Sequence, residues 1–339
     1  MSHGRLIRHE FAPVADLSGA TLGDLGAELL SRIDTGEKHF SRQQLEKHLS
    51  LVSRLHDATG ALMEAPENRE SIAHFAAQFN FVHHCWRKHG VPIAGATHVD
   101  IGCGALNPLA RLFTHLMLGA RRAIGIDMDP PISLPQATRN LARLAAAAIL
   151  DPARIYGAFP ISGRDVLFHL AGFDLAKLQH GDPEGMAPTR IALQQTPIES
   201  TGLPTASVDV VISNSVLEHL DSLDPALAEM ARITQPGGYG IHGIDTIDHR
   251  WYGEPDRHPL DFLTIDTSDA IVFGCNRIRL VEFPGIFRRH GFEVVDFWTH
   301  KSLSMTPEFR ARLLEPWASM TDEALETTWA SVLVRRLPN

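Results

Sequence analysis

Cysteine is scarce in this sequence, and its three copies lie far apart. Cys85, Cys103 and Cys275 form no CxxC pair within the 339 residues. Thiol-rich zinc sites and disulfide frameworks need more cysteines or closer spacing. The pattern argues against a zinc ribbon and against a disulfide-stapled fold. It favours a reducing compartment, so we expect a cytoplasmic protein.

Long apolar runs and basic clusters are also missing. The longest apolar stretch, residues 141–150, falls short of the roughly 18 residues that a membrane span needs, and it contains Arg143. The opening MSHGRLIRHEF has no apolar stretch typical of a secretory signal. The formal net charge is −9, and basic residues occur as short pairs such as Arg121–Arg122. Nucleic-acid binding needs clustered Lys and Arg. We therefore expect neither a nucleic-acid partner nor a membrane partner.

What the sequence does hold, from Thr97 onward, is an alternation of short apolar strands with helices. We predict strands at 97–101, 122–127, 190–196, 208–213, 236–245, 292–299 and 328–336, and helices at 108–118, 135–150, 225–234 and 281–290. Such alternation is typical of a parallel sheet covered by helices on both faces. No regular crossover helix joins the last two strands, which fits an antiparallel last strand. The predicted fold is α/β, with a Rossmann-like, doubly wound, seven-stranded sheet.

The rest of the chain divides around this pattern. Residues 1–95 are predicted to form a helical N-terminal region, which includes a helix at 69–88, and residues 96–339 to form the α/β domain. Three segments exceed normal connection lengths: 151–189, 246–280 and 302–327. We expect these insertions and the N-terminal region to form a cap on the acceptor side, over the edge of the sheet where ligands bind.

A glycine-rich turn follows the first predicted strand. In HVDIGCGALN (98–107), Gly102 and Gly104 lack a Cβ and would let the backbone approach a ligand closely. Asp127 ends the next strand, where an acid can hydrogen-bond both hydroxyls of a ribose. This pattern predicts a nucleotide-type cofactor.

The order of the later motifs indicates which nucleotide-type cofactor the chain binds. TPIESTGLPTASVDVVISNSVLEHL (196–220) is followed by ARITQPGGYGIHGID (231–245). Together with the glycine turn and Asp127, this series resembles the class I methyltransferases that depend on S-adenosylmethionine (SAM), within the subfamily called methyltransferase type 11. The resemblance covers about residues 97–245. It implies an enzyme whose cofactor is SAM.

The resemblance also implies roles for the residues that match the family motifs. Asp100 with the backbone of Gly102 and Gly104 would face the methionine part of SAM, and Asp127 would hold the ribose. The other implied cofactor residues are Ile198 and Glu199 at the adenine, and Ser213 and Asn214 near the sulfonium and carboxylate.

The first motif departs from the family in one position. Leu106 stands where the third glycine is usual, and Asn107 and Pro108 follow it. We expect Asn107 to cap the next helix, with Pro108 in its first turn. The missing glycine also argues against a nucleotide-dependent oxidoreductase, the rival that shares this strand–turn–helix geometry.

Acid and imidazole side chains gather after the fifth strand, where the methyl group should lie. We predict that His249 is the general base, with Asp245 or Asp248 as its orienting carboxylate, and that His219 competes for the role. Reaction by proximity alone, without a base, remains an alternative.

Two further clusters suggest binding roles. Arg277 and Arg279 alternate in CNRIRL, would share one face of a strand, and could bind an anionic acceptor. Glu218–His219 resembles a metal-binding pair, but the acid that such sites need three residues earlier is Ser215 here. We therefore expect no metal site.

The predicted function is transfer of a methyl group from SAM to a small-molecule acceptor, as O-methylation of a hydroxyl. S-methylation of a small thioether acid and N-methylation by proximity and desolvation are the alternatives. A non-catalytic SAM-binding or partner-binding protein is the alternative of another class. The oligomeric state stays open.

Overall fold

The computed structural model describes residues 87–91, 93–156, 161–254 and 256–338. The predicted helix at 69–88 and nearly all of the predicted N-terminal region therefore lie outside the described residues. The chain divides into two compact units. The first contains Cys103–Gly125 and Asp129–Leu193 together with the described residues before Ala96, and the second contains Ala96–Gly102, Ile126–Met128 and the chain from Gln194.

The first unit is built on two helices with apolar faces. Its elements are α5 (Pro108–Met117), α6 (Leu134–Leu150), α7 (Pro152–Tyr156), α8 (Gly163–His169), α9 (Leu175–Gln179), η2 (Pro183–Gly185) and the strand β3 (Ile191–Gln195). The Ser133 hydroxyl caps α6 by accepting from the Gln136 N–H at 3.2 Å. Leucines and alanines of α5 and α6 form one core with the apolar side chains of 151–189. The described part of that segment is thus helical and packs into this core, and its predicted role as a cap stays a prediction.

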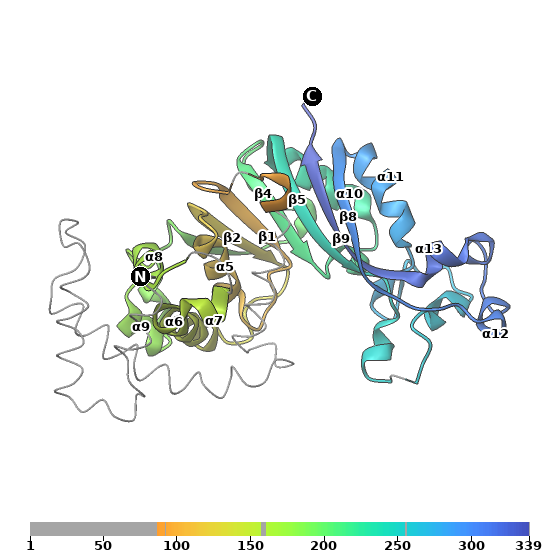
Figure 1. Ribbon diagram of the computed structural model, residues 1–339, viewed down its shortest axis with the longest axis horizontal. Coiled ribbons are helices and arrows are strands. Elements are labelled where there is room, and N and C mark those ends of the chain that lie inside the picture. The colour runs from red at the N-terminus through yellow and green to blue at the C-terminus, as the bar shows by residue number, and fades with distance from the viewer. Residues whose placement is uncertain (1–86, 92, 157–160, 255, 339) are drawn as a thin grey trace. The chain divides into compact units, whose positions relative to one another are not determined.

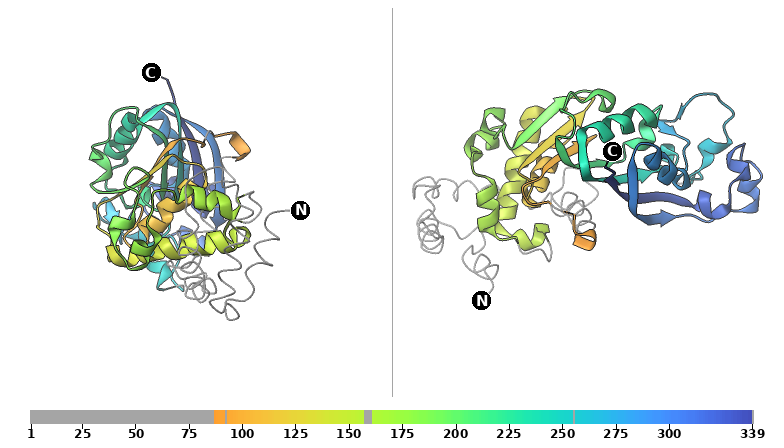
Figure 2. Two further views of the ribbon diagram at one scale, coloured as in Figure 1. Left: turned by 90° about the vertical axis from the view of Figure 1, so that its left-hand side faces the viewer. Right: turned by 90° about the horizontal axis from the view of Figure 1, so that it is seen from above.

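The sheet has seven strands in the order β3-β2-β1-β4-β5-β9-β8 (Figure 1). Its further strands are β1 (Thr97–Ile101), β2 (Arg122–Asp127), β4 (Val208–Asn214), β5 (Thr234–Asp245), β8 (Phe292–Ser302) and β9 (Thr327–Arg336). β1 and β5 run parallel to β4, whereas β9 runs antiparallel to both β5 and β8. Figure 2 shows β8 and β9, in blue, alongside each other. The predicted seven-stranded sheet and its antiparallel last strand are confirmed.

Within the second unit, two helices accompany these strands. They are α10 (Leu223–Ile233) and α11 (Phe283–Arg289), the latter beginning directly after the short turn η7 (Leu280–Glu282). The single helix predicted at 281–290 is therefore a 3-10 turn followed by a shorter α-helix, because Pro284 fits only the first turn of a new helix. Among the described residues no helix is long and apolar enough to cross a bilayer.

The insertions 246–280 and 302–327 pack against each other in this unit. They hold η5 (His249–Tyr252), η6 (Asp261–Thr264), β6 (Ile271–Val272), β7 (Cys275–Asn276), α12 (Pro307–Arg310), η8 (Trp317–Ser319) and α13 (Asp322–Glu326). Phe262 and Cys275 of the first insertion share one apolar cluster with Phe309, Leu313 and Trp317 of the second. The two insertions thus form a small core of their own.

A tight hairpin connects β6 and β7. Its two turn residues, Phe273 and Gly274, both have positive φ, at 52° and 84°. This is the backbone of a type I′ turn, which suits the twist of paired strands. Asn276 then fixes the hairpin to the segment after β4, because its Nδ2 donates to the carbonyls of Leu217 at 2.8 Å and Leu220 at 3.1 Å.

Candidate cofactor and acceptor site

The glycine turn after β1 requires glycine at its first position. Gly102 has φ of +63°, and its N–H donates to the Ile126 carbonyl at 2.8 Å. A Cβ at this position would lie 2.2 Å from Cγ2 of Val216, which follows β4. The preceding Asp100 is fully buried within β1. The Gly102 backbone therefore lies directly against the Val216 side chain, just beyond the carboxyl end of β4.

Gly104 belongs to the first unit and has a different reason to be glycine. Its φ is +81°, but nothing lies within 4 Å of the place that a Cβ would take. The prediction for the next residues is partly wrong. Pro108 stands in the first turn of α5, but the Asn107 side chain makes no capping hydrogen bond. Its Oδ1 instead accepts from Nδ2 of Asn140 on α6, since that buried amide needs an acceptor.

The residues predicted for ribose and adenine lie on neighbouring segments of the second unit. The half-buried Asp127 ends β2, and its carbonyl accepts from the Thr196 N–H at 3.0 Å. The turn η3 (Ile198–Ser200) starts two residues later, with Ile198 buried and Glu199 exposed. An apolar side chain beside two accessible carboxylates could bind an adenosine moiety.

A buried carboxylate fixes the end of this adenosine-binding segment. Glu229 of α10 accepts from the Thr201 N–H at 2.9 Å and from its hydroxyl at 2.6 Å. Arg232 donates to the same carboxylate through Nε at 2.6 Å. The Arg232 guanidinium and the Thr201 donors hold the pKa of Glu229 at about 2. Glu229 therefore stays charged and positions the loop that carries Ile198 and Glu199.

The end of β4 holds a buried pair, Ser213 with His242, that no sequence motif indicated. Ser213 is 1% exposed, and its hydroxyl pairs with Nδ1 of His242 on β5 at 2.8 Å. Burial lowers the pKa of His242 to about 3, so its ring is neutral and stacks on Phe287. The Ser213 hydroxyl is therefore engaged in the core. Asn214 is half-buried at the strand end, and its proposed contact with SAM stays a prediction.

Ser215 adopts a strained backbone directly after Asn214. Its φ is 54°, a left-handed value that costs non-glycine residues about 1–2 kcal/mol. The conformation lets the Ser215 N–H donate to the Gly243 carbonyl at 2.9 Å. Strain of this kind often accompanies functional sites. No sequence motif indicated this strained backbone.

The two candidate bases come together in the structure. His219 ends η4 (Leu217–His219), and His249 begins η5 after β5. Their ring centroids are 4.9 Å apart at an interplanar angle of 69°. Nδ1 of His219 pairs with the Gly274 carbonyl at 2.6 Å, and since a carbonyl only accepts, this nitrogen carries the proton. Nε2 of His219 then carries the lone pair.

Cys275 joins this imidazole pair, although no motif pointed to it. The side-chain ligand atoms of His219, His249 and Cys275 all lie within 4.8 Å of one another. Cys275 is buried, and burial together with the Glu218 carboxylate raises the pKa of its thiol to about 12. The backbone N–H of His249 hydrogen-bonds the sulfur and opposes part of that rise.

The two carboxylates predicted to orient His249 have structural partners. Oδ1 of Asp245 accepts from the Ile247 N–H at 3.2 Å, and Oδ2 accepts from the Tyr252 hydroxyl. Asp248 is fully buried and forms a two-pronged pair with Arg250, with Nη2 to Oδ2 at 2.5 Å. Their orienting role stays a prediction.

Glu218 lies buried behind the imidazole pair. It is 0% exposed, and its Oε1 accepts from the Asp245 N–H at 3.2 Å. Its Oε2 has no hydrogen-bond partner in the part of the chain that the structure describes. Burial, with the nearby Asp245 charge adding to it, raises the pKa of Glu218 to about 8.

The arginines predicted to bind an anionic acceptor are placed differently from the expectation. β7 ends at Asn276, so they do not alternate along a strand. Arg277 donates to the carbonyls of Ile265 at 3.0 Å and Thr267 at 2.9 Å and stacks over Trp317. Arg279 is fully buried. The geometry gives both a structural role, and anion binding by them stays a prediction.

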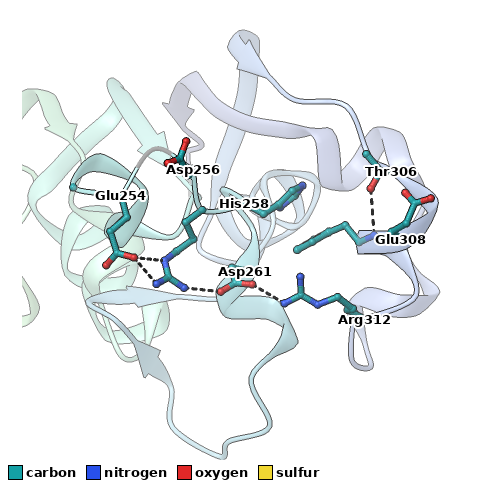
Figure 3. Close-up of a pocket in the computed structure, with 10 residues that line it drawn as sticks. Glu254, Asp256, His258, Asp261, Thr306, Glu308 and Arg312 are labelled. Atoms are coloured by element: carbon teal, nitrogen blue, oxygen red, sulfur yellow. Dashed lines mark hydrogen bonds and ion pairs between the residues drawn. The ribbon is translucent and has the colours of Figure 1, made fainter.

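An open pocket of about 830 Å³ lies in the two insertions of the second unit (Figure 3). Asp261 lies at its centre and forms ion pairs with Arg257 and Arg312, both at 2.9 Å. The His258 ring stacks on Phe309 at 3.4 Å between centroids. None of the predicted site residues lines this pocket, and its arginines are already paired. It is therefore not our candidate for the reaction centre.

Comparisons with known proteins test which family the chain resembles. A family model described as a methyltransferase domain matches residues 164–241. A search of curated proteins finds no match. Among solved structures, the chain is similar to a SAM-dependent methyltransferase from Methanosarcina mazei, with 14% identity, TM-score 0.42, and coverage of 75% of this chain and 98% of that one. A SAM-dependent methyltransferase from Mesorhizobium loti gives 16% identity, TM-score 0.38, and coverage of 74% and 95%.

A third similar structure is the geranyl diphosphate C-methyltransferase from Streptomyces coelicolor A3(2), with 16% identity, TM-score 0.40, and coverage of 77% and 79%. The family-model match spans the edge strand β3, the central strand β4 and most of the neighbouring β5. This match, on a seven-stranded sheet whose last strand is antiparallel, supports a class I SAM-dependent methyltransferase.

Proposed function

We propose that this methyltransferase transfers the methyl group of SAM to a hydroxyl group of a small molecule. The observation that carries the proposal is the pair of imidazoles, His219 and His249, 4.9 Å apart just beyond the carboxyl ends of β4 and β5. Parallel sheets of this class bind their ligands at that edge. A hydroxyl must lose a proton as it is methylated, and an imidazole at this edge supplies a suitable acceptor.

For the cofactor, we propose that Asp127 binds the ribose hydroxyls and that Ile198 and Glu199 contact the adenine. The half-buried Asp127 and the exposed Glu199 can both reach a ligand, and the buried Ile198 would support the adenine from the core side. Asp100, Gly102, Gly104, Ser213 and Asn214 complete the proposed set toward the methionine part. The Gly102 turn supports this because it follows β1 directly, at the edge where such sheets bind ligands.

The proposed reaction is a direct displacement. The acceptor oxygen forms a bond to the methyl carbon, the carbon–sulfur bond breaks, and its electron pair stays on sulfur to give S-adenosylhomocysteine. The hydroxyl proton passes to His249, the leading base, or to Nε2 of His219. Asp245 or Asp248 would stabilise the protonated ring of His249. Most of the rate enhancement would come from positioning and desolvation of the acceptor.

The first experiment tests the cofactor. Calorimetry with SAM, S-adenosylhomocysteine and NAD should give binding for the first two and none for NAD. A panel of small acceptors that carry a hydroxyl, a thioether or an amine then tests the acceptor class, with product identified by mass spectrometry. Transfer to thioethers or amines and not to hydroxyls would reject O-methylation. SAM binding without any transfer would favour a non-catalytic protein.

The second experiment tests the imidazoles. His249→Ala and His219→Ala should each be compared with His219→Asn, a variant that keeps a donor for the Gly274 carbonyl but has no Nε2. Loss of a general base typically lowers the rate by about 10²–10⁴-fold with cofactor affinity unchanged. If all three variants react within a few-fold of the parent, neither imidazole activates the acceptor.

A further inference from the structure

We propose that His219, His249 and Cys275 bind a divalent transition-metal ion, of the kind represented by Zn²⁺, and that a fourth coordination position is open to the acceptor hydroxyl. Only the role of the fourth position rests on the proposed function. Binding of the ion by the three side chains is independent of it.

The first support is the geometry of the three ligand atoms. They come from three separate segments, η4, η5 and β7, and all lie within 4.8 Å of one another. A tetrahedral ion with bonds of about 2.0–2.3 Å places its ligand atoms about 3.3–3.8 Å apart. Small rotations of the side chains would therefore bring the cluster onto a common centre.

The second support is the way in which the ligands are held. Imidazoles that bind metals usually donate their other ring N–H to a carboxylate or a backbone carbonyl, which fixes the ring and raises its basicity. His219 does this through Nδ1 to the Gly274 carbonyl at 2.6 Å, and its Nε2 remains as ligand. The residue that offers this carbonyl immediately precedes Cys275. The His249 backbone N–H donates to the Cys275 sulfur, which links two of the three ligand residues directly.

The third support is the rigidity of the supporting segments. Asn276 ties the β6–β7 hairpin to both ends of η4 through the carbonyls of Leu217 and Leu220. The Asp248 N–H donates to the Pro259 carbonyl at 2.7 Å, and its carboxylate accepts from the Arg250 N–H at 3.0 Å, which fixes the start of η5. The three ligands are thus positioned by backbone hydrogen bonds, as a metal site requires.

The fourth support is the charge around the cluster. Glu218, Asp245 and Asp248 all lie near enough to the Cys275 sulfur to raise the pKa of its thiol. Arg250 pairs with Asp248, but Oε2 of the fully buried Glu218 has no hydrogen-bond partner among the described residues. Burial makes the charged form of such an acid costly unless a positive charge or hydrogen bonds compensate it. A divalent cation at the cluster would provide that charge.

The donor set selects the kind of ion. Two imidazoles and one thiolate are ligands for Zn²⁺ and similar borderline-soft ions, whereas Mg²⁺ and Ca²⁺ prefer oxygen. Zinc sites with three protein ligands keep a fourth position for water or substrate. His219 is exposed, so a molecule can reach the cluster from solvent.

At this fourth position the ion would activate the acceptor. A hydroxyl bound to the ion loses its proton to solvent at a lower pH, as zinc-bound water does. The resulting oxygen anion attacks the methyl carbon, and the electron pair of the carbon–sulfur bond stays on sulfur. An imidazole whose lone pair binds the ion cannot accept the proton, so this role would replace the direct base role proposed above while O-methylation itself is kept.

The test uses the full chain after treatment with a chelator. Zn²⁺ titrated by calorimetry should bind with a stoichiometry of one, and Co²⁺ should give tetrahedral ligand-field bands with a thiolate-to-cobalt charge-transfer band. Cys275→Ser should abolish the charge-transfer band, and His219→Ala or His249→Ala should weaken binding by at least about tenfold. Cys103→Ser is the matched control, since Cys103 is also buried but lies outside the cluster. It should keep the band.

Circular dichroism and SAM binding establish that each variant is folded. No stoichiometric binding of Zn²⁺ or Co²⁺ by the folded parent, or a charge-transfer band that survives in Cys275→Ser, would overturn the site. If O-methylation persists after chelation yet falls in His249→Ala, the imidazole acts directly as base; the open-position role is then refuted and the proposed function stands. If the ion binds but hydroxyls are not methylated, the site stands and the proposed function fails.

Discussion

Substitution of Gly102 by alanine tests the contact that holds the glycine turn against the end of β4. The added Cβ would lie 2.2 Å from Cγ2 of Val216, far inside van der Waals contact. The next nearest atom, Cβ of Val216, would be at 3.4 Å, an ordinary contact. The clash therefore comes from one methyl group, and Val216→Ala removes it.

The expected cost has two parts. An alanine at positive φ costs about 1–2 kcal/mol relative to glycine, and forcing extra volume into a packed contact costs about 1–3 kcal/mol. Gly102→Ala should therefore lower the free energy of unfolding by about 2–5 kcal/mol. Gly104→Ala carries only the first part, because its Cβ would meet open space, and should cost about 1–2 kcal/mol.

Urea unfolding measures both parts of the cost. The proteins compared are the parent, Gly104→Ala, and the double-mutant cycle of Gly102→Ala with Val216→Ala. The cycle should give a coupling free energy of about 1–3 kcal/mol, because the second substitution relieves the clash that the first creates. A coupling near zero, or equal losses for Gly102→Ala and Gly104→Ala, would refute the reasoning from contact distance.

Three further predictions concern the cofactor and the supporting residues. Asp127→Ala should weaken SAM binding by about 2–4 kcal/mol in calorimetry through the loss of two ribose hydrogen bonds; unchanged affinity would reject the ribose assignment. His242→Asn should remove the contribution of one titrating ring to the pH dependence of the free energy of unfolding. The folded pKa of about 3 lies below the unfolded value of 6.5, so the parent is fully stabilised above pH 6.5 and loses up to about 1.4 kcal/mol per unit as the pH falls toward 3. An unchanged slope in the variant would contradict this. Glu229→Gln should cost about 1.5–3 kcal/mol at neutral pH, since Thr201 and Arg232 lose a charged acceptor. Because the folded pKa of about 2 lies below 4.5, the deficit should shrink as acid unfolding is approached from pH 4.5 downward; a constant deficit would argue against a charge effect.

The sheet could be predicted from the sequence because its strands are short apolar runs bounded by glycine or polar residues. THVDI and RAIGID each became a strand with the expected ends, and the Ala- and Leu-rich stretch became α6. In a sheet buried on both faces, local composition is enough to mark each strand. The motif order then indicated the family, which the comparison with a methyltransferase domain supports.

The acceptor side could be predicted only in part. His219 and His249 were singled out, but nothing in the sequence pairs them with Cys275, because a hairpin held by the Asn276 side chain brings the cysteine back. Arg279 illustrates the opposite error. Its alternation with Arg277 suggested an exposed strand face, but tertiary packing encloses its side chain completely. Contacts between segments that are distant in sequence leave no periodic signal.

The buried Arg279 side chain links the two insertions. Its guanidinium donates to the carbonyl of Thr246, where the first insertion leaves β5, and to those of Leu325 and Thr327, where the second insertion enters β9. A charge enclosed in this way is stable only while all three carbonyls surround it. Displacing either junction would leave that charge with fewer acceptors, so we expect the two insertions to unfold together.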